Sequence, residues 1–376
     1  KIFKVKKKEK KYKLIIDFNK KNKLVSIKKR FSSKSMFNEK YPYRSSMSNT
    51  MKESFKKFAN DIKKKIKPKK ILEIGCNDGS FLKFFDKNSS LGIEPCKNIA
   101  KLSKAQNINV IAKYWNLKLS KKILQKFGKF DLIYSANTIT HINDLNEVFK
   151  SINIVLEKNG ILIIEDPSLL ECINNNAYDQ FYNEHVYVFS YLSLSKILKK
   201  NKFKIFKKEN LKVHGGSLRY YISNEKTKIK IHKSVFIQKQ KEINKGLDDF
   251  ITYKKFAKRV KSSKLKLKKI FENLKKRKKV VIGYGATAKS VTVLNYCKIN
   301  NSYIKYFLDT TPEKKNKLLP GLKIPIKKYN KKLLNKANYV FLGAWNFEKE
   351  IIKKEHKYIR NGGKFFTHIP KPRFIK

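Results

Sequence analysis

The chain has 376 residues and a formal net charge of +61 at pH 7, from 90 lysine and arginine residues against 29 aspartate and glutamate residues. With 41% hydrophobic residues it can bury real cores, and its length predicts two or three domains. No apolar run approaches the roughly 20 residues that a membrane-spanning helix needs, and the N-terminus shows no apolar signal-like core, so we expect no membrane association.

The positive charge is not organised like a nucleic-acid-binding surface. Nearly all of the excess is lysine, spread along the whole chain and interleaved with acidic and apolar residues, whereas the arginines are scattered singly. A nucleic-acid footprint should form a patch or stripe that includes arginine. We therefore expect no specific nucleic-acid partner, although some non-specific affinity for polyanions follows from the charge.

The cysteines are far apart in the sequence. Cys76, Cys96, Cys172 and Cys297 form no Cys-x-x-Cys pair. This spacing argues against a metal cluster or a disulfide framework and is typical of the reducing cytoplasm, where we expect the protein to lie.

Changes of composition divide the chain into four expected parts. A lysine-rich start with short apolar runs predicts a small module, which a helix from Met51 to Ile66 follows before Pro68 ends it. The expected parts are an N-terminal module over 1–55, a cofactor-binding α/β domain over 56–225, a helical linker over 226–278 and a second, smaller Rossmann-like domain over 279–376.

Residues 70–82 organise the larger domain. They are expected to form a buried strand ending in Glu73, a loop with Gly75 and Gly79, and the start of a helix packed by Phe81, Leu82 and Phe85. The next expected strand, 90–93, ends in Glu94. A strand, a glycine loop, a helix and a second strand ending in an acid form a mononucleotide-binding half, in which that acid accepts hydrogen bonds from ribose hydroxyls.

The glycine spacing selects among cofactors. A dinucleotide site needs Gly-x-Gly-x-x-Gly facing a pyrophosphate, whereas this loop is Glu73-x-Gly75-x-x-x-Gly79 with Asp78 inside it. A carboxylate there would repel a pyrophosphate and suits the cationic amino-acid end of S-adenosylmethionine (SAM). The alternative is an α/β domain with a tight turn and no cofactor.

Further strands complete the predicted sheet. A strand over 130–134 is followed by a loop that holds Asn137 and His141, and a buried strand over 160–164 ends in Glu165 and Asp166. Because open α/β sheets bind ligands at the carboxyl ends of their strands, both loop residues are candidates to face the SAM pocket. A structural role for His141 is the alternative.

The insertion after this strand contains the candidate acid–base group. Tyr182, Glu184 and His185 lie within four residues, and Tyr178 would share a helical face with Tyr182 and His185 if the segment were helical. Histidine exchanges a proton near neutral pH, and a neighbouring carboxylate can orient the ring. Aromatic packing around an incidental histidine is the alternative.

Two glycine-rich segments are further candidates. His214-Gly-Gly-Ser-Leu-Arg219 is either a bend before a strand or an anion site in which backbone amides act with Arg219. The second strand and glycine loop, around Gly283 and Gly285, end at Lys289. This loop repeats the strand–glycine loop–helix pattern of residues 70–82.

Together, these motifs resemble the sugar C-methyltransferases that act on nucleotide-linked 4-keto-deoxy sugars. The resemblance covers roughly residue 36 to the end, in the order of Glu73, Gly75, Asn77 and Gly79, then His141, Tyr182-x-Glu184-His185, the His214–Arg219 segment, and Gly283-x-Gly285 to Lys289. It implies a class I SAM-dependent methyltransferase domain followed by a smaller Rossmann-like domain.

The resemblance also implies residue roles. His185 resembles the general base that removes a proton beside the sugar's keto group, and the resulting enolate attacks the SAM methyl. Tyr182, Glu184 and His141 match residues that line the reacting sugar, and either Tyr41 or Tyr43 matches a tyrosine that reaches it. The substrate-binding set is expected to include Tyr41, Tyr43, Tyr178, His214, Arg219, Gly283, Gly285 and Lys289. The last three would face the diphosphate, and a Rossmann turn without a ligand is the alternative.

One departure from the family concerns zinc. The family carries an N-terminal module with four cysteines, whereas no cysteine precedes Cys76 here, and Asn19 and Asn22 stand where one Cys-x-x-Cys is expected. Zinc needs thiolate or imidazole ligands at fixed spacing. We expect no zinc: either the site has decayed or the sequence begins after part of it.

Two other functions remain as alternatives. A class I methyltransferase acting on another small acceptor keeps all of these motifs. A nucleic-acid methyltransferase needs a motif such as Asn-Pro-Pro-Tyr where this chain has Ser135-Ala136-Asn137-Thr138. The expected partner is a small nucleotide sugar, bound by a monomer or homodimer. The sequence leaves open the sugar, the nucleotide and the carbon methylated.

Overall fold

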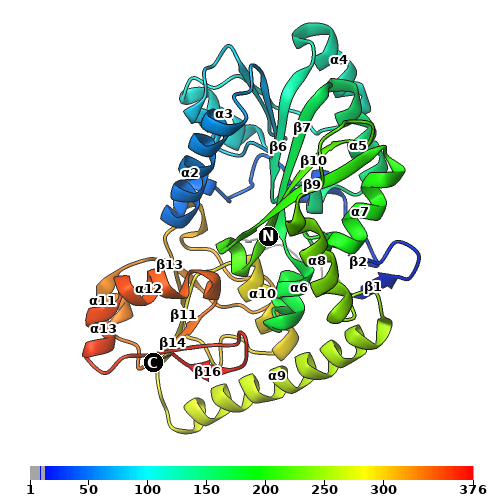
Figure 1. Ribbon diagram of the computed structural model, residues 1–376. Coiled ribbons are helices and arrows are strands. Elements are labelled where there is room, and N and C mark those ends of the chain that lie inside the picture. Colours follow the sequence, from blue (N-terminus) through cyan, green and yellow to red (C-terminus); the bar gives the residue numbers. More distant parts are fainter. Residues whose placement is uncertain (1–8, 10–12, 376) are drawn as a thin grey trace. The chain divides into compact units, whose positions relative to one another are not determined.

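The computed structural model describes Glu9 and residues 13–375, which form two compact units (Figure 1). The N-terminal unit comprises Ile16–Leu170 and Glu184–Asp249. The C-terminal unit comprises Glu171–Asn183 and Phe250–Lys376, together with the described residues before Ile16. The chain thus leaves the C-terminal unit after Asn183, directly before Glu184 and His185.

A seven-stranded sheet forms the centre of the N-terminal unit, in the order β5-β4-β3-β6-β7-β10-β9. The first five of these strands run parallel to one another, and β10 is antiparallel to both β7 and β9. The strands are β3 (Ile71–Ile74), β4 (Ser90–Ile93), β5 (Val110–Ile111), β6 (Phe130–Ala136), β7 (Leu156–Pro167), β9 (Phe203–Leu211) and β10 (Ser217–Asn224). The strand order reverses between β3 and β6, where doubly wound sheets place their ligand crevice.

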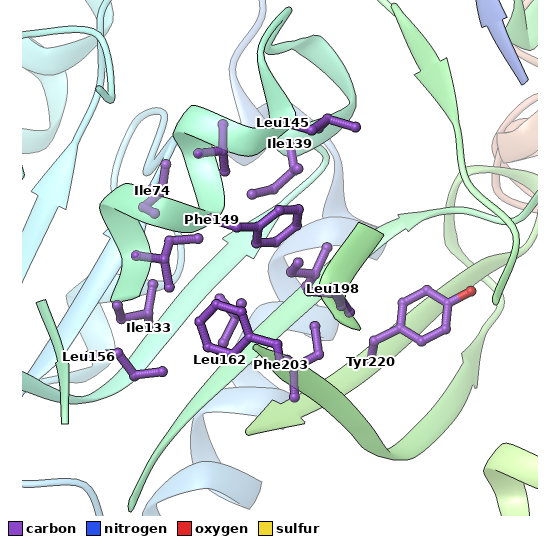
Figure 2. Packing of buried hydrophobic residues seen from close by; sticks show 14 of the residues in the cluster. Ile74, Ile133, Ile139, Leu145, Phe149, Leu156, Leu162, Leu198, Phe203 and Tyr220 are labelled. Carbon is purple, nitrogen blue, oxygen red and sulfur yellow. The ribbon is translucent and has the colours of Figure 1, made fainter. Parts of the chain in front are cut away.

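Helices cover both faces of this sheet (Figure 1). One apolar cluster includes residues of α2 (Asn49–Lys65) and α3 (Lys97–Ala105), and the other includes residues of α4 (Leu117–Phe127), α5 (Leu145–Val155), α7 (Tyr191–Lys200) and α8 (Lys233–Asn244). Figure 2 shows part of the second cluster, where Phe149 of α5 lies near Phe203 of β9 with ring centroids 6.3 Å apart.

Local sequence signals explain where these helices begin. Ser48 caps α2 by accepting a hydrogen bond from the amide of Met51, and the buried face of α2 includes Phe55 and Phe58. Ser190 and Ser193 form a capping box at the start of α7. Each cap satisfies amides that would otherwise lack partners and is typically worth about 1 kcal/mol.

The helix predicted after the first glycine loop is wrong. The chain forms only a short 3-10 turn, η2 (Leu82–Phe84), before β4 begins. Asp86 accepts hydrogen bonds from the amide of Asn88 through its side chain and from the hydroxyl of Ser90 through its carbonyl. These local bonds compete with helical ones, while Phe81 and Leu82 are still fully buried.

A small antiparallel sheet, β1-β2-β8, contains the N-terminal hairpin. Its strands are β1 (Ile16–Asn19), β2 (Leu24–Ile27) and β8 (Tyr187–Val188). In the hairpin turn the side-chain oxygen of Asn19 accepts from the amides of Lys21 and Asn22, and that of Asn22 accepts from the amide of Leu24. Asparagine side chains therefore satisfy the turn at the positions where the sequence comparison expected cysteines.

The C-terminal unit has a six-stranded sheet in the order β13-β12-β11-β14-β15-β16, parallel except for β16. Its strands are β11 (Val281–Tyr284), β12 (Phe307–Asp309), β13 (Ile326–Lys328), β14 (Tyr339–Leu342), β15 (Lys364–Thr367) and β16 (Arg373–Phe374). The remaining α-helices in the described part of the chain are α1 (Ser33–Met36), α6 (Leu169–Asn174), α9 (Phe250–Lys276), α10 (Ala288–Cys297), α11 (Lys331–Leu334), α12 (Glu348–Lys354) and α13 (His356–Arg360). The predicted α/β class with two Rossmann-like sheets is confirmed.

Candidate active site

Gly75 shapes the crevice where the strand order reverses. Its φ of +80° lies in the left-handed region that favours glycine. A Cβ at this position would lie 2.1 Å from Oγ1 of Thr138, which follows β6. Gly75 therefore allows the loops after β3 and β6 to approach each other, and a larger residue would force them apart.

Acidic side chains gather at this end of the sheet. Glu94 accepts hydrogen bonds from the amides of Asn77 (3.1 Å) and Cys96 (2.8 Å). Glu73 is buried, and its Oε2 has no hydrogen-bond partner. Burial raises the pKa of Glu73 well above its ordinary value, and repulsion from Asp78, Glu165 and Glu94 adds to the increase. A cationic ligand would relieve both effects.

The side chains of Asn77 and Asp78 bind residues 41–46, which we call the strap. Asn77 accepts from the amide of Ser45 (2.8 Å) and donates to the carbonyl of Tyr43 (3.3 Å). Asp78 accepts from the amide of Ser46 (3.1 Å). Asp78, whose carboxylate is predicted to suit the cationic end of SAM, therefore helps to fix the strap against the glycine loop.

His141 lies beside both Glu184 and His185. Its Nδ1 is 2.7 Å from the carbonyl oxygen of Glu184, so Nδ1 carries the proton, because a carbonyl can only accept. The rings of His141 and His185 have centroids 5.1 Å apart. Burial lowers the pKa of His141 to about 4, although bonds to the carbonyls of Glu184 and Asn137 oppose the decrease. His141 is therefore neutral at pH 7.

His185 itself is buried and is followed at once by a strand held on several sides. The amide of Val186 donates to the carbonyl of Thr140 (3.0 Å), and the carbonyl of Val186 accepts from the amide of Ile27 (2.9 Å). The hydroxyl of Thr140 also donates to the carbonyl of Tyr187. The loop after β6 and the N-terminal hairpin therefore fix the backbone on which the imidazole is carried.

The structure distinguishes the two candidate tyrosines of the strap. The hydroxyl of Tyr41 lies 3.4 Å from Oε2 of Glu184, to which it donates, whereas the side chain of Tyr43 is 44% exposed. Phe37 packs edge-on against both Tyr41 and His141, with ring centroids 5.2 Å apart in each pair. Tyr41, Glu184, His141 and His185 thus form one cluster within the N-terminal unit.

For the methyl transfer that the sequence predicts, Tyr41→Phe should lower kcat about tenfold and leave SAM affinity unchanged, because it removes one hydrogen bond to a carboxylate without changing the strap's backbone. Tyr43→Phe is the matched control and should be silent. Steady-state kinetics with calorimetric SAM titration would check both variants. Equal losses from both would show that the hydroxyl of Tyr41 has no particular role.

The guanidinium of Arg219 binds two carboxylates of the sheet and does not face an anion site. Its Nε donates to Glu165, its Nη1 donates to Glu209 (3.1 Å), and its guanidinium lies 3.4 Å from the ring centroid of Phe58. Only 6% of the residue is exposed. These contacts give Arg219 a structural role between β7, β9 and α2, in place of the predicted contact with substrate.

Tyr178 and Tyr182, the other candidate residues of the insertion, do not belong to the N-terminal unit that contains His185. Residues 178–180 form a single 3-10 turn, so the conditional helical face of Tyr178, Tyr182 and His185 does not exist. Tyr178 is buried edge-on against Tyr296 (5.9 Å between centroids) inside the C-terminal unit. Tyr182 also falls in that unit, one residue before the chain leaves it. Substrate contacts by Tyr178 and Tyr182 remain predictions.

The second glycine loop uses its amides internally. The amides of Gly283 and Gly285 donate to carbonyls of the neighbouring strand, and that of Ala286 donates to Asp309. Lys289 differs, since its Nζ is buried without a hydrogen-bond partner. A diphosphate contact at this loop therefore remains a prediction only through Lys289.

His214 and Asn137 both adopt left-handed backbone conformations at strand ends. His214, with φ of 54°, lies in the turn between β9 and β10, where the amide of Gly216 donates to the carbonyl of Val213. Asn137, with φ of 50°, follows β6 and donates its amide to the carbonyl of Glu165. The turn accounts for the glycines after His214, and the ligand roles of both residues remain predictions.

The position of Phe37 and the strap's attachment to the glycine loop could not be predicted from the sequence. Phe37 and Tyr41 are four positions apart in the sequence, but nothing in that spacing indicates packing on a histidine about a hundred residues away. Among the residues that the structure describes, no group of three or more His, Cys, Asp or Glu side chains could hold a metal ion. None of the described helices is both long and apolar enough to cross a bilayer.

Comparisons with known proteins define the class. Residues 43–208 match the family model of a methyltransferase domain, and residues 212–370 match that of a C-methyltransferase C-terminal domain. The chain therefore belongs to the methyltransferases that join these two domains, and it is a SAM-dependent C-methyltransferase. The C-methyltransferase NovU of Streptomyces niveus is 28% identical over 307 residues, which cover 81% of this chain and 73% of that protein.

Solved structures are more distant. The magnesium protoporphyrin IX methyltransferase of Synechocystis PCC 6803 with bound SAM is 13% identical, covering 46% of this chain and 80% of that chain with a TM-score of 0.34. A SAM-dependent methyltransferase of Thermotoga maritima, described as a possible histamine N-methyltransferase, is 16% identical, covering 46% and 89% with a TM-score of 0.35. Both likenesses are too weak to carry an argument.

Proposed function

We propose that the chain transfers the methyl group of SAM to a carbon beside the keto group of a nucleotide-linked 4-keto-deoxy sugar. The observation that carries the proposal is the cluster of His185 with a neutral His141, both beside Glu184, which the hydroxyl of Tyr41 also reaches. Forming an enolate needs a positioned base and fixed hydrogen-bond donors near neutral pH. The cluster contains side chains for both tasks.

Each side chain of the cluster has a proposed part in proton removal. His185 takes the proton from the carbon beside the ketone, which leaves an enolate. Because Nδ1 of His141 is committed to a backbone carbonyl, His141 holds Glu184 in place and remains neutral. Tyr41, Tyr182 and Glu184 orient the base or hold the enolate oxygen while negative charge develops there.

SAM would supply an electrophilic methyl group on a positively charged sulfur. The residues at the β3–β6 crevice fit this cation, because the partnerless Oε2 of Glu73 lies among other acids. The proposed cofactor-binding set is Glu73, Gly75, Asn77, Gly79, Glu94 and Asn137. Within this set, the carboxylate of Glu94 accepts hydrogen bonds from two backbone amides. These bonds hold it in an orientation in which it would accept further hydrogen bonds from ribose hydroxyls.

The product of methyl transfer tests this proposal. With SAM carrying a ¹³C methyl group, incubation with dTDP-, GDP- and CDP-linked 4-keto sugars should give a new ¹³C methyl signal coupled to a sugar carbon beside the ketone. Coupling across oxygen or nitrogen, or turnover only with other small acceptors, would contradict a sugar C-methyltransferase. A small acceptor of another class would then become the favoured substrate.

A further inference from the structure

Asp179 lies at the end of two strands of the C-terminal sheet. Its carboxylate accepts hydrogen bonds from Nε1 of Trp345 (2.6 Å) and from Nε2 of His368 (3.0 Å). Trp345 begins the turn after β14, and His368 directly follows β15. The side chains of Asp179 and His368 are both 0% exposed. One buried carboxylate therefore joins the ends of two adjacent parallel strands.

The surroundings keep this carboxylate charged. Burial raises the pKa of Asp179, but His368, Lys289 and Trp345 outweigh that effect and leave the pKa below its ordinary value. The ammonium of Lys289 lies 5.1 Å from the centroid of the Trp345 ring. Because a buried charge that loses one of its partners is strongly destabilising, this arrangement holds the segment firmly.

Other contacts attach the same segment, Glu171–Asn183, to the C-terminal unit. Nη2 of Arg259 in α9 donates to the carbonyl of Ile173 (2.7 Å). The ring of Phe181 packs edge-on against Phe256 of α9, with centroids 6.2 Å apart. The segment interrupts the N-terminal unit in sequence, yet it folds as part of the C-terminal unit. It then continues without a break into Glu184 and His185.

We propose that Asp179 is a positioning residue, which anchors the chain leading into Tyr182, Glu184 and His185 to the strand ends of the C-terminal sheet. The strand-end loops of that sheet accordingly serve as an anchor for the catalytic segment. The kinetic part of this inference rests on the proposed function. The structural part, the anchoring of the segment, does not depend on any substrate.

Hydrogen–deuterium exchange of the full-length protein tests the anchor directly. Both donors reach the same oxygen, Oδ2. Asp179→Asn removes the negative charge that strengthens both hydrogen bonds, so amides in 177–186 should exchange at least tenfold faster. Asp309→Asn is the matched control: Asp309 is also buried in this unit and accepts from Ala286 and Lys314, but it does not touch the segment. Its variant should leave exchange in 177–186 unchanged.

Variants of the two donors keep the test decisive if Asp179→Asn does not fold. His368→Gln retains a side-chain N–H and should preserve slow exchange in 177–186, whereas Trp345→Phe removes a donor and should accelerate it. Equal exchange in all of these variants would overturn the proposal, as would equal acceleration in Asp309→Asn.

The kinetic consequence has a separate readout. We expect Asp179→Asn to lower kcat about tenfold or more while the Kd for SAM stays within a factor of two of the native value. Unchanged kcat with accelerated amide exchange would overturn the positioning role. Absence of turnover by the native protein on every keto sugar would instead refute the proposed function and leave the exchange result standing.

Discussion

His185→Ala should lower kcat for methyl transfer by roughly 10²–10⁴, the contribution that a positioned general base typically makes. The Kd for SAM should not change, because the glycine loop after β3 and the acids around Glu73 do not include this ring. The imidazole is buried beside the neutral ring of His141. Rapid-quench kinetics with saturating SAM would separate the chemical step from binding.

The matched control for this variant is His356→Ala, the same substitution at an exposed position of α13. It should retain full activity. His141→Asn should show a smaller defect than His185→Ala, because an asparagine N–H can still donate to the carbonyl of Glu184. A His185→Ala enzyme with native kcat would show that His185 is not the general base.

Glu73→Gln should weaken SAM binding about 10- to 100-fold, since a charged hydrogen bond is worth about 1.5–3 kcal/mol. The same change should stabilise the protein without SAM. Because the pKa of Glu73 is raised on folding, there is a pH range in which the folded protein keeps a proton on Glu73 that the unfolded chain releases. The free energy of unfolding therefore falls as pH rises above the unfolded-state pKa, and glutamine removes this loss.

Calorimetric SAM titration and thermal unfolding between pH 5 and pH 8 would measure both effects. The difference in Tm between Glu73→Gln and the native protein should grow with pH, and SAM binding by the native protein should release a proton. Glu157→Gln, an exposed glutamate in β7, carries the same charge change and should show neither effect. A native-like Kd in Glu73→Gln would contradict a cation site at this carboxylate.

The parts of the fold that depend on local pattern could be predicted from the sequence. The strand that carries Glu73, the turn at Gly75 and the strand that Glu94 follows could be predicted from apolar runs, glycine conformation and acid placement. The structure contains all three, although β3 ends at Ile74 and β4 at Ile93. The helix expected at Phe81 failed because Asp86 offers competing hydrogen bonds to Asn88 and Ser90. The spacing of apolar residues, on which the helix prediction depended, contains no information about these hydrogen bonds.

The pairing of distant charged groups could not be predicted. In the sequence, an arginine near a Gly-Gly turn at the start of a strand looks like an anion site. In the structure, Arg219 forms ion pairs with Glu165 and Glu209 on the two neighbouring strands. Likewise, Asp179 meets His368 across 189 residues of sequence. Both partnerships depend on sheet order, which a single sequence specifies only through the complete fold.

Sequence resemblance and structure contribute differently to the active site. The resemblance proposed His185, Glu184 and His141, and the structure places these three together in one unit. The sequence could not show which of Tyr41 and Tyr43 reaches the active site, because both lie a few residues before the same helix. The structure shows that the hydroxyl of Tyr41 reaches Glu184. The division of the chain into parts at 55, 225 and 278 and the decay of a zinc site remain predictions.

The most direct measurement of the central claim is solvent deuterium exchange into a 4-keto sugar nucleotide by the native enzyme without SAM. Proton removal precedes methyl transfer in this account, so deuterium should appear at the carbon beside the ketone at a rate that His185→Ala reduces at least 100-fold. A native enzyme that methylates the sugar carbon while His185→Ala exchanges deuterium equally fast would contradict it.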